Sequence, residues 1–211
     1  MKQYEIRNAS ADAQNVYNGM LPFGSLYEDT DGVRDIDLRT LHFKEGRLFI
    51  DGEINRPAAM RFVSAMVYLA QQKQDVTVYI NSPGGEVNAG LLMYDVMQDY
   101  PGRIDTVCTG IAASMAAVLL AGGQKGHRFI LPHSQVMIHE PLISGGFGGS
   151  ASSVEKTALS ILETKSILNG LLAEHTGKTE EEINSATAYD NYMDAYAAVD
   201  FGICDGIRGI F

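Results

Sequence analysis

The chain has 211 residues, 45% of them hydrophobic, and its formal net charge is −10. This length and composition predict one sizeable hydrophobic core, and no Pro- or Ser-rich linker divides the chain into two domains. The acidic balance argues against nucleic acid or an anionic membrane as the main partner, because both carry negative charge themselves.

Targeting and redox signals are weak in this sequence. Residues 1–10, MKQYEIRNAS, carry polar residues where a secretory signal needs an apolar core. The most membrane-like stretch, residues 111–123, is too short and too rich in small residues to span a bilayer. Cys108 and Cys204 lack metal-ligand spacing, and two thiols in apolar segments suit a reducing compartment. We therefore expect a cytoplasmic protein without a metal or another cofactor.

Strand-like and helix-like segments alternate from residue 47 onwards. Apolar, β-branched runs predict strands over residues 47–52, 76–80, 104–108, 128–132 and 135–140. Helical periodicity predicts helices over residues 57–72, 85–100, 116–121 and 151–174, the first opened by Pro57 and the second stopped before Pro101. Such alternation favours a mostly parallel sheet with helices packed outside, and functional sites at the carboxyl ends of its strands.

Two of these strand ends carry residues suited to acyl transfer. In YINSPGGEVNAG (79–90), Gly84 and Gly85 allow backbone conformations that expose bare N–H groups. In GIAASMAA (110–117), Ser114 stands where a strand gives way to a helix, which predicts an outward hydroxyl beside unpaired amides. The residues alone leave an alternative open, because a serine before an alanine-rich helix is more often an N-cap than a nucleophile.

A histidine follows a third strand, in VMIHEP (136–141). By itself, His139 is more typical of a partly buried structural histidine than of a catalytic base. A zinc site is not indicated, since His133 and His139 stand six residues apart and no HExxH sequence occurs. A serine, a glycine corner and a histidine at three strand ends nevertheless form a constellation that indicates nucleophilic catalysis.

Together, INSPGGEVNAG, GIAASMAA with the following LLAGG, and VMIHEP resemble the proteolytic subunit of the Clp protease family, the self-compartmentalised serine peptidases. The resemblance runs from about residue 44 to residue 207. It implies an α/β protein with the Clp protease and crotonase-like fold, built of repeated strand-turn-helix units with a protruding long handle helix. It also implies that Ser114 is the nucleophile, His139 the general base, and the Gly85 and Met115 N–H groups the oxyanion hole.

The acid of the triad is implied by the resemblance alone. The chain has 26 Asp and Glu residues, and its residue pattern does not distinguish one of them. In TAYDNYMDAYAAVDFG (187–202), Asp190 takes the place of the family's acid, which would orient His139 and stabilise its imidazolium form. Without the resemblance, Asp190 reads as an aspartate at a helix boundary.

The glycine-rich stretch SGGFGGS (144–150) has two interpretations. Its composition is typical of a flexible linker. The resemblance implies instead a strand that lines the cleft and pairs with an extended substrate, an interaction that every peptide backbone can make. On that basis the expected substrate-binding residues are Gly84, Leu142, Gly145, Gly146 and Phe147.

The resemblance also implies an assembly. A divergent N-terminal, pore-gating segment would cover residues 1–40, and one peptidase domain residues 41–211, with a handle at about 151–175. The apolar stripe of this helix is core packing by default, and in the family it serves contacts between rings. The expected assembly is a homo-oligomer of heptameric rings, which stack as a tetradecamer in the family, and the expected substrates are polypeptides.

Several residues depart from the family pattern. Tyr189, preceded by Ala188, stands where the family has an arginine that pairs between rings. Thr77 and Asp99 occupy positions of the aromatic pocket that docks the AAA+ unfoldase, although Tyr79 remains. A carboxylate in place of an aromatic ring weakens apolar anchoring, so we expect poor docking of the usual unfoldase.

Three functions remain open on the sequence. An active serine endopeptidase is favoured by the three triad positions. A crotonase-like acyl-CoA enzyme would use paired N–H groups for a thioester enolate and would need no serine. A weakly active or partner-dependent ring subunit would keep the fold without full activity.

Overall fold

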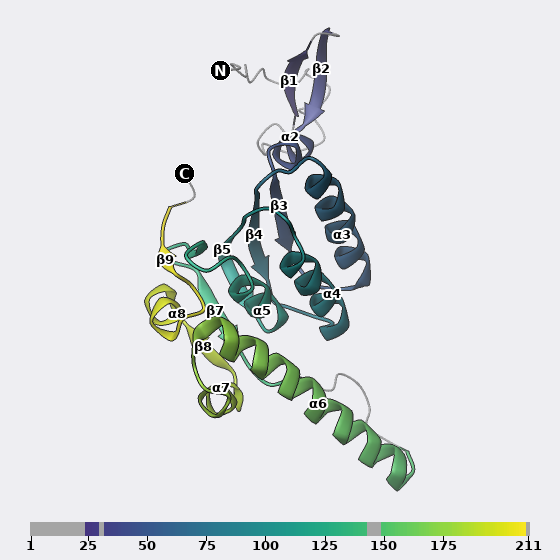
Figure 1. Cartoon of the computed structure of the whole chain (residues 1–211), viewed down its shortest axis with the longest axis vertical. Helices are drawn as coiled ribbons and strands as arrows, with labels where there is room; N and C mark the ends of the chain where they lie inside the picture. The colour runs from purple at the N-terminus through teal and green to yellow at the C-terminus, as the bar shows by residue number, and fades with distance from the viewer. Residues whose placement is uncertain (1–23, 30–31, 143–148, 210–211) are drawn as a thin grey trace, which may run out of the picture. The chain divides into compact units, whose positions relative to one another are not determined.

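The computed structural model describes residues 24–29, 32–142 and 149–209. Contacts within the chain define two compact units, residues 1–47 and 48–211. All the residues that the sequence predicts for the functional site belong to the second unit, which is coloured from blue to yellow in Figure 1.

The first unit contains a hairpin and a short helix. Strand β1 (Gly24–Asp29) pairs antiparallel with β2 (Gly32–Asp37), so that Tyr27 lies opposite Arg34. Helix α2 (Leu38–Lys44) follows β2, with His42 and Lys44 in its last turn. Cations near a helix C-terminus interact favourably with the partial negative charge of the last carbonyl groups. The sequence pattern predicted no element in this region.

The second unit is organised around a seven-stranded sheet. Five strands follow the order β3-β4-β5-β6-β9, while β7 pairs with β5 and β8 with β7. β5 pairs parallel with β4, β6 and β7, β6 pairs parallel with β9, and β8 pairs antiparallel with β7. The strands are β3 (Arg47–Asp51), β4 (Val76–Ser82), β5 (Ile104–Ala113), β6 (Arg128–Ile130), β7 (Gln135–Ile138), β8 (Asn191–Met193) and β9 (Gly206–Ile207). The predicted α/β fold with a mostly parallel sheet is confirmed.

Strand β5 is longer than the sequence predicts. The apolar run ends at residue 108, whereas the strand continues through the small residues to Ala113. Gly110 lies against Asn81 so closely that a Cβ atom there would overlap the Asn81 amide, and Ile111 N donates to Asn81 Oδ1 at 3.3 Å. Small residues here therefore allow close strand packing, in addition to forming the turn that the sequence indicated.

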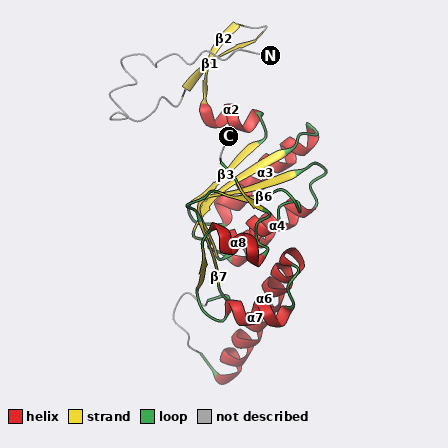
Figure 2. Ribbon diagram, turned by 90° about the vertical axis from the view of Figure 1, so that its left-hand side faces the viewer, coloured by secondary structure: helices red, strands yellow, loops and turns green. Residues whose placement is uncertain are grey.

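Three helices pack in a row, α3 against α4 and α4 against α5 (Figure 1), and Figure 2 shows α3 and α4 from the side. Helix α3 (Arg56–Gln71) is capped by Asn55, whose Oδ1 accepts from Ala58 N at 3.0 Å. Helix α4 (Val87–Gln98) begins two residues later than predicted, and α5 (Met115–Ala121) begins directly after Ser114. All seven residues of α5 are buried, so this helix forms the centre of the core.

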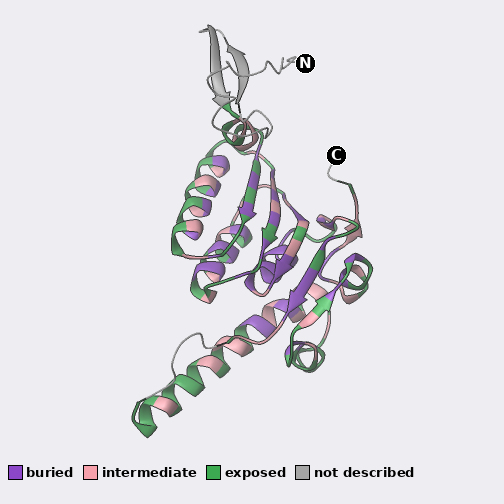
Figure 3. Ribbon diagram, turned by 180° about the vertical axis from the view of Figure 1, so that it is seen from behind, coloured by how far each residue is buried: buried purple, intermediate pink, exposed green. Residues whose placement is uncertain are grey.

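The long helix α6 (Ala151–Thr176) extends from the sheet, and Figure 3 shows its outer half exposed. It begins at Ser150, whose side chain accepts from Ser153 N, and ends at Gly177 in the left-handed conformation. Only Leu168, Asn169 and Leu172 are buried in it, so most of the predicted apolar stripe is not core. None of the described helices is long and apolar enough to cross a membrane.

Two short helices complete the second unit. Helix α7 (Glu180–Thr187) opens with a capping box, in which Thr179 and Glu182 bond to each other's backbone N–H groups. Helix α8 (Ala195–Phe201) is capped by Asp194, whose Oδ1 accepts from Ala197 N at 2.8 Å. Between these helices, β8 brings residues 188–190 back to the sheet beside β7.

A polar network anchors the C-terminal end of α6 to the sheet. Buried Arg128 on β6 donates to both oxygens of Asp205, at 2.6 and 2.9 Å, and to the carbonyl of His175 at 2.9 Å. The ring of His175 lies 2.7 Å from the hydroxyl of Tyr94 on α4. Burial lowers the pKa of His175, nearby Glu174 opposes this shift, and Arg128 adds to it. Burial, with Glu174 and Asp95, raises the pKa of Tyr94 to about 12.

We predict that His175 makes the stability of the fold depend on pH. Because its folded pKa lies below the ordinary 6.5, the unfolded chain binds this proton first. The free energy of unfolding should therefore fall as the pH drops through 6.5 towards the folded pKa. Urea unfolding at pH 7.5 and 5.5 tests this, with His175→Gln as the comparison. The variant should lose less stability between the two pH values, and an equal loss would contradict the assignment.

Candidate active site

Strand pairing brings the three predicted triad residues together. β5 and β7 run parallel with Ala113 opposite Met137, so Ser114 and His139 both follow carboxyl ends of neighbouring strands. β8 runs antiparallel to β7 with Asn191 opposite Ile138, so Asp190 precedes β8 beside the end of β7. One ladder of hydrogen bonds therefore places residues 114, 139 and 190 at the same edge.

Ser114 occupies a backbone conformation that non-glycine residues rarely adopt. Its φ is 55° and its ψ is −123°, and only Lys73 among the other described non-glycine residues has positive φ. The Ser114 N–H donates to Met137 O at 2.8 Å, which holds this turn against β7. Although Ser114 stands at the N-cap position of α5, its side chain caps no helix amide. The N-cap interpretation is therefore wrong for the hydroxyl group.

The Ser114 hydroxyl is instead bonded to the imidazole of His139. Ser114 Oγ lies 2.9 Å from His139 Nε2, and His139 Nδ1 lies 3.1 Å from Asp190 Oδ1. The His139 side chain is 14% exposed, whereas that of Asp190 is 58% exposed. Asp190 is thus neither a helix cap nor a remote surface carboxylate, since it contacts the histidine ring. The structure brings all three predicted residues into one chain of hydrogen bonds.

The glycine corner between β4 and α4 packs directly against this turn. Gly84 has φ 89°, and a Cβ atom there would lie 2.6 Å from Ala113 O and 2.8 Å from Ser114 Cβ. Gly85 has φ 151° and is bridged to Ile54, whose backbone would overlap a Cβ atom at Gly85. Both glycines are therefore required by close backbone approach as well as by conformation. This extended segment is also the reason that α4 does not begin at Gly85, as the sequence predicted.

Two residues that line a cavity with Ser114, Gly85 and Met115, have backbone N–H groups without a hydrogen-bond acceptor among the described residues. In the bridge to Ile54, Gly84 O accepts from Ile54 N and Glu86 N donates to Ile54 O, both at 2.8 Å. The Gly85 N–H therefore points away from Ile54, as the alternation of an extended strand requires. Met115 is the first residue of α5, where an N–H has no acceptor within the helix. Such amides can receive an ion or a polarised carbonyl oxygen.

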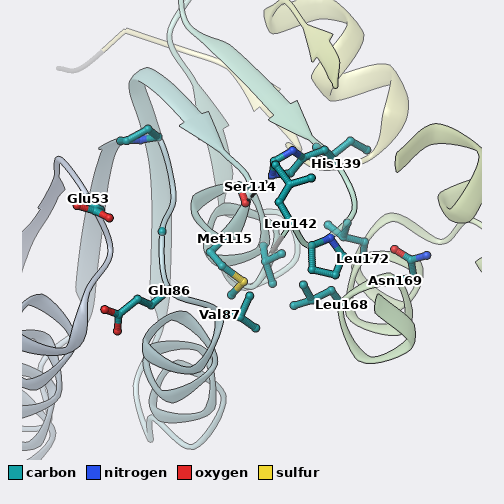
Figure 4. A pocket seen from close by; sticks show the side chains of 15 residues that line it. Glu53, Glu86, Val87, Ser114, Met115, His139, Leu142, Leu168, Asn169 and Leu172 are labelled. Atoms are coloured by element: carbon teal, nitrogen blue, oxygen red, sulfur yellow. Dashed lines mark hydrogen bonds between the residues drawn. The ribbon is translucent and has the colours of Figure 1, made fainter. Parts of the chain in front are cut away.

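A cavity of about 360 Å³ opens beside Ser114 and His139. Figure 4 shows the side chains of Val87, Met115 and Leu168 gathered in it below Ser114, while Glu86 points away. Apolar side chains form the larger part of its lining, and polar groups form a substantial part. Its lining comprises Glu53, Pro83, Gly85, Glu86, Val87, Ser114, Met115, Val118, Ile138, His139, Pro141, Leu142, Leu168, Asn169 and Leu172.

The cavity has one wall that sequence reasoning missed. Leu168, Asn169 and Leu172 come from the buried part of α6, whereas the sequence assigned this helix to packing or ring contacts. Of the predicted substrate-binding residues, Leu142 lines the cavity and is 73% exposed. Gly84 lies behind Ser114 and is absent from the lining. Gly145, Gly146 and Phe147 lie outside the described residues.

The described part of the chain contains no cluster of three or more His, Cys, Asp or Glu side chains that could hold a metal ion. Cys108 and Cys204 are buried and free, and burial raises the pKa of both thiols. The polar groups around the cavity are therefore a hydroxyl, an imidazole, carboxylates, an amide and backbone N–H groups, which suit proton transfer and binding of a carbonyl oxygen.

We predict that Gly84→Ala displaces Ser114 and destabilises the fold. The added methyl group would press on Ala113 O and on the Ser114 side chain, at a φ that alanine disfavours. We expect a loss of about 1–3 kcal/mol in the free energy of unfolding. Gly170→Ala is the matched control, because a Cβ atom there meets nothing within 4 Å. It should be neutral or stabilise α6 by up to about 1 kcal/mol. Thermal unfolding measures both, and equal melting temperatures would contradict the tight packing.

The chain matches a known protein family. The family model described as Clp protease matches residues 30–210, which is well over half of the chain. The matched region includes both glycines of the corner, the serine turn, the histidine segment and the segment that carries Asp190. This chain therefore belongs to the Clp protease family.

Proposed function

We propose that the chain is a serine endopeptidase subunit that cleaves unfolded polypeptides and short peptides through Ser114, His139 and Asp190. The observation that carries this proposal is the pair of hydrogen bonds through His139, at 2.9 Å to Ser114 and 3.1 Å to Asp190. Membership in the Clp protease family supports peptide bonds as the target. Nucleophile, base and orienting group stand in the order that acyl transfer requires.

The proton moves along this chain of hydrogen bonds. When neutral His139 donates its Nδ1–H to Asp190, its Nε2 lone pair faces the Ser114 hydroxyl. Nε2 takes the serine proton as Oγ attacks the substrate carbonyl carbon, and the imidazolium then gives that proton to the leaving amine. Water, deprotonated by the same nitrogen, releases the acyl group from Ser114. Asp190 stays ionised throughout and stabilises the transient imidazolium.

The oxyanion that forms during this attack needs two donors. Gly85 and Met115 are the residues we assign, since each has an N–H beside Ser114 that its own segment leaves available. Loss of one such donor typically costs about 2.7–4 kcal/mol of transition-state stabilisation. The unusual φ of Ser114 supports the assignment, because it turns the chain sharply enough for α5 to begin directly at the next residue.

The cavity would bind a substrate side chain that is apolar and of moderate size. Met115, Val118 and Ile138 lie on its inner side, and Leu168 and Leu172 on the α6 side. An extended peptide would add its backbone to the segment around Leu142 and to the glycine-rich residues that follow. Backbone pairing of this kind gives affinity with little sequence preference, which fits a protease for many polypeptides.

Two other functions receive less support. A crotonase-like acyl-CoA enzyme needs paired N–H groups but no serine bonded to histidine, so the 2.9 Å contact would have no role there. A weakly active, partner-dependent subunit would have a misaligned triad, whereas both hydrogen bonds of His139 are formed in the single chain.

The proposed peptidase would cleave short peptides without ATP, and folded proteins only together with an unfoldase.

We further propose that the subunits form homo-oligomeric rings, heptameric and stacked as a tetradecamer, with residues 1–40 as a gating segment before the peptidase domain. Supporting this, the outer part of α6 exposes Leu159 and Leu162. Tyr189, in contrast, is 86% exposed and offers no charge for a salt bridge between rings, so stacking would have to use other contacts. Phe49 and Tyr79 stack at 5.2 Å on the sheet, so an aromatic surface for an unfoldase persists despite Thr77 and Asp99.

We predict that Ser114→Ala abolishes hydrolysis of fluorogenic peptides and labelling by a fluorophosphonate. The loss in kcat should be roughly a millionfold, because the nucleophile and its base act as a unit. Ser64→Ala is the control, since Ser64 is exposed on α3 and its hydroxyl donates to the Met60 carbonyl of the same helix. Native mass spectrometry should give the same oligomer for both variants. Undiminished turnover by Ser114→Ala would refute the proposed nucleophile.

A further inference from the structure

An ion pair joins the segment that carries His139 to the long helix. Glu140 follows His139 directly, and its Oε2 lies 2.7 Å from Nζ of Lys165 on α6. The Lys165 side chain is 23% exposed and that of Glu140 is 41% exposed. Neither residue is among those that line the cavity beside Ser114.

Glu140 also joins the His139 segment to the segment that carries Asp190. Glu140 N donates to the carbonyl of Thr187, the last residue of α7, at 2.8 Å. Three residues later the chain reaches Asp190, which accepts from the His139 ring. Glu140 thus holds the backbone of the histidine segment at a fixed distance from the carboxylate that orients the imidazole.

Helix α6 also contacts Thr187, the residue whose carbonyl accepts from Glu140 N. Asn169 lies one turn after Lys165, is buried, and accepts from the Thr187 hydroxyl at 3.4 Å. The Asn169 amide also contacts Asn184 Oδ1 at 3.5 Å. Side chains four residues apart on a helix lie on one face. One face of α6 therefore contacts both Glu140 and Thr187, and so both sides of the His139–Asp190 bond.

We propose that Lys165 and Glu140 are positioning residues, which hold His139 in line between Ser114 and Asp190. The inference rests on the proposed peptidase function and extends it to residues outside the cavity. His139 follows the last residue of β7, and the β7–β8 ladder ends at the pair Ile138 and Asn191, so His139 lies outside this ladder. The ion pair supplies the missing restraint from α6. Any movement of α6 relative to the sheet is thereby transmitted to the imidazole.

A positioning role predicts a particular kinetic effect. A partly exposed ion pair adds little to global stability, because solvent screens it. A small displacement of a catalytic group, in contrast, can slow the chemical step up to about 100-fold. Loss of the pair should therefore lower kcat while leaving KM for a short peptide and the melting temperature nearly unchanged.

The test compares four variants of the full chain in its native oligomer. Lys165→Met keeps most of the length of the side chain and removes its charge, and we expect kcat to fall by about 5- to 100-fold. Lys165→Arg keeps the charge and should retain most of the activity. The double variant Glu140→Lys with Lys165→Glu reverses the pair and should recover a large part of the loss. Lys156→Met is the control, since Lys156 is an exposed residue of α6 without an ion pair among the described residues.

A crystal structure of Lys165→Met provides a readout that does not depend on activity. We expect the distance from His139 Nε2 to Ser114 Oγ to exceed the 2.9 Å of the native chain and to leave hydrogen-bond range. Wild-type kcat in Lys165→Met, or a reversed pair as slow as Lys165→Met, would overturn the proposal. If the native chain shows no Ser114-dependent hydrolysis, the proposed function fails separately. The crystal structure then decides the positioning role, and an unchanged His139 would overturn it.

Discussion

The register of the ladder formed by β5, β7 and β8 is the constraint on which the rest of the site depends. Ala113 lies opposite Met137, and Ile138 opposite Asn191, so the residues next to these pairs meet at one edge. A slip of one residue in either pairing would turn every side chain of the strand to the other face. Ser114, His139 and Asp190 would then no longer form one hydrogen-bonded chain.

The turn at Ser114 is strained, and the surrounding core maintains it. A non-glycine residue at φ 55° is held in a sparsely populated conformation only where its neighbours require it. Here α5 is buried along its whole length, and the Ser114 amide is bonded to Met137. Gly84 fills the space behind the turn so closely that no side chain fits there. The rigid core thus holds the hydroxyl towards the imidazole and away from the helix amides.

Helix α6 combines two roles that depend on different parts of its length. Its buried part forms one wall of the cavity through Leu168 and Leu172, and contacts the histidine segment through Lys165. Its outer part exposes apolar side chains that the single chain leaves uncovered. A helix is stiff along its axis, so contacts made by the outer part bear on the position of the inner part. The proposed assembly and the proposed triad are thereby connected through one element.

The sequence by itself determined the local features of this protein. Alternating apolar runs and helical periods predicted most of the strands and helices between residues 47 and 176, with errors of a few residues at their ends, but none of the elements before residue 47. The motifs around Gly85, Ser114 and His139 indicated the family. Asp190 was reached only through the resemblance, because its contact with His139 spans 51 residues and no local pattern records it. The extension of β5, the late start of α4 and the cavity wall from α6 were decided by the tertiary structure alone. Each depends on close approach between segments distant in the chain, such as Gly110 with Asn81 and Gly85 with Ile54, and local propensity carries no information on such contacts.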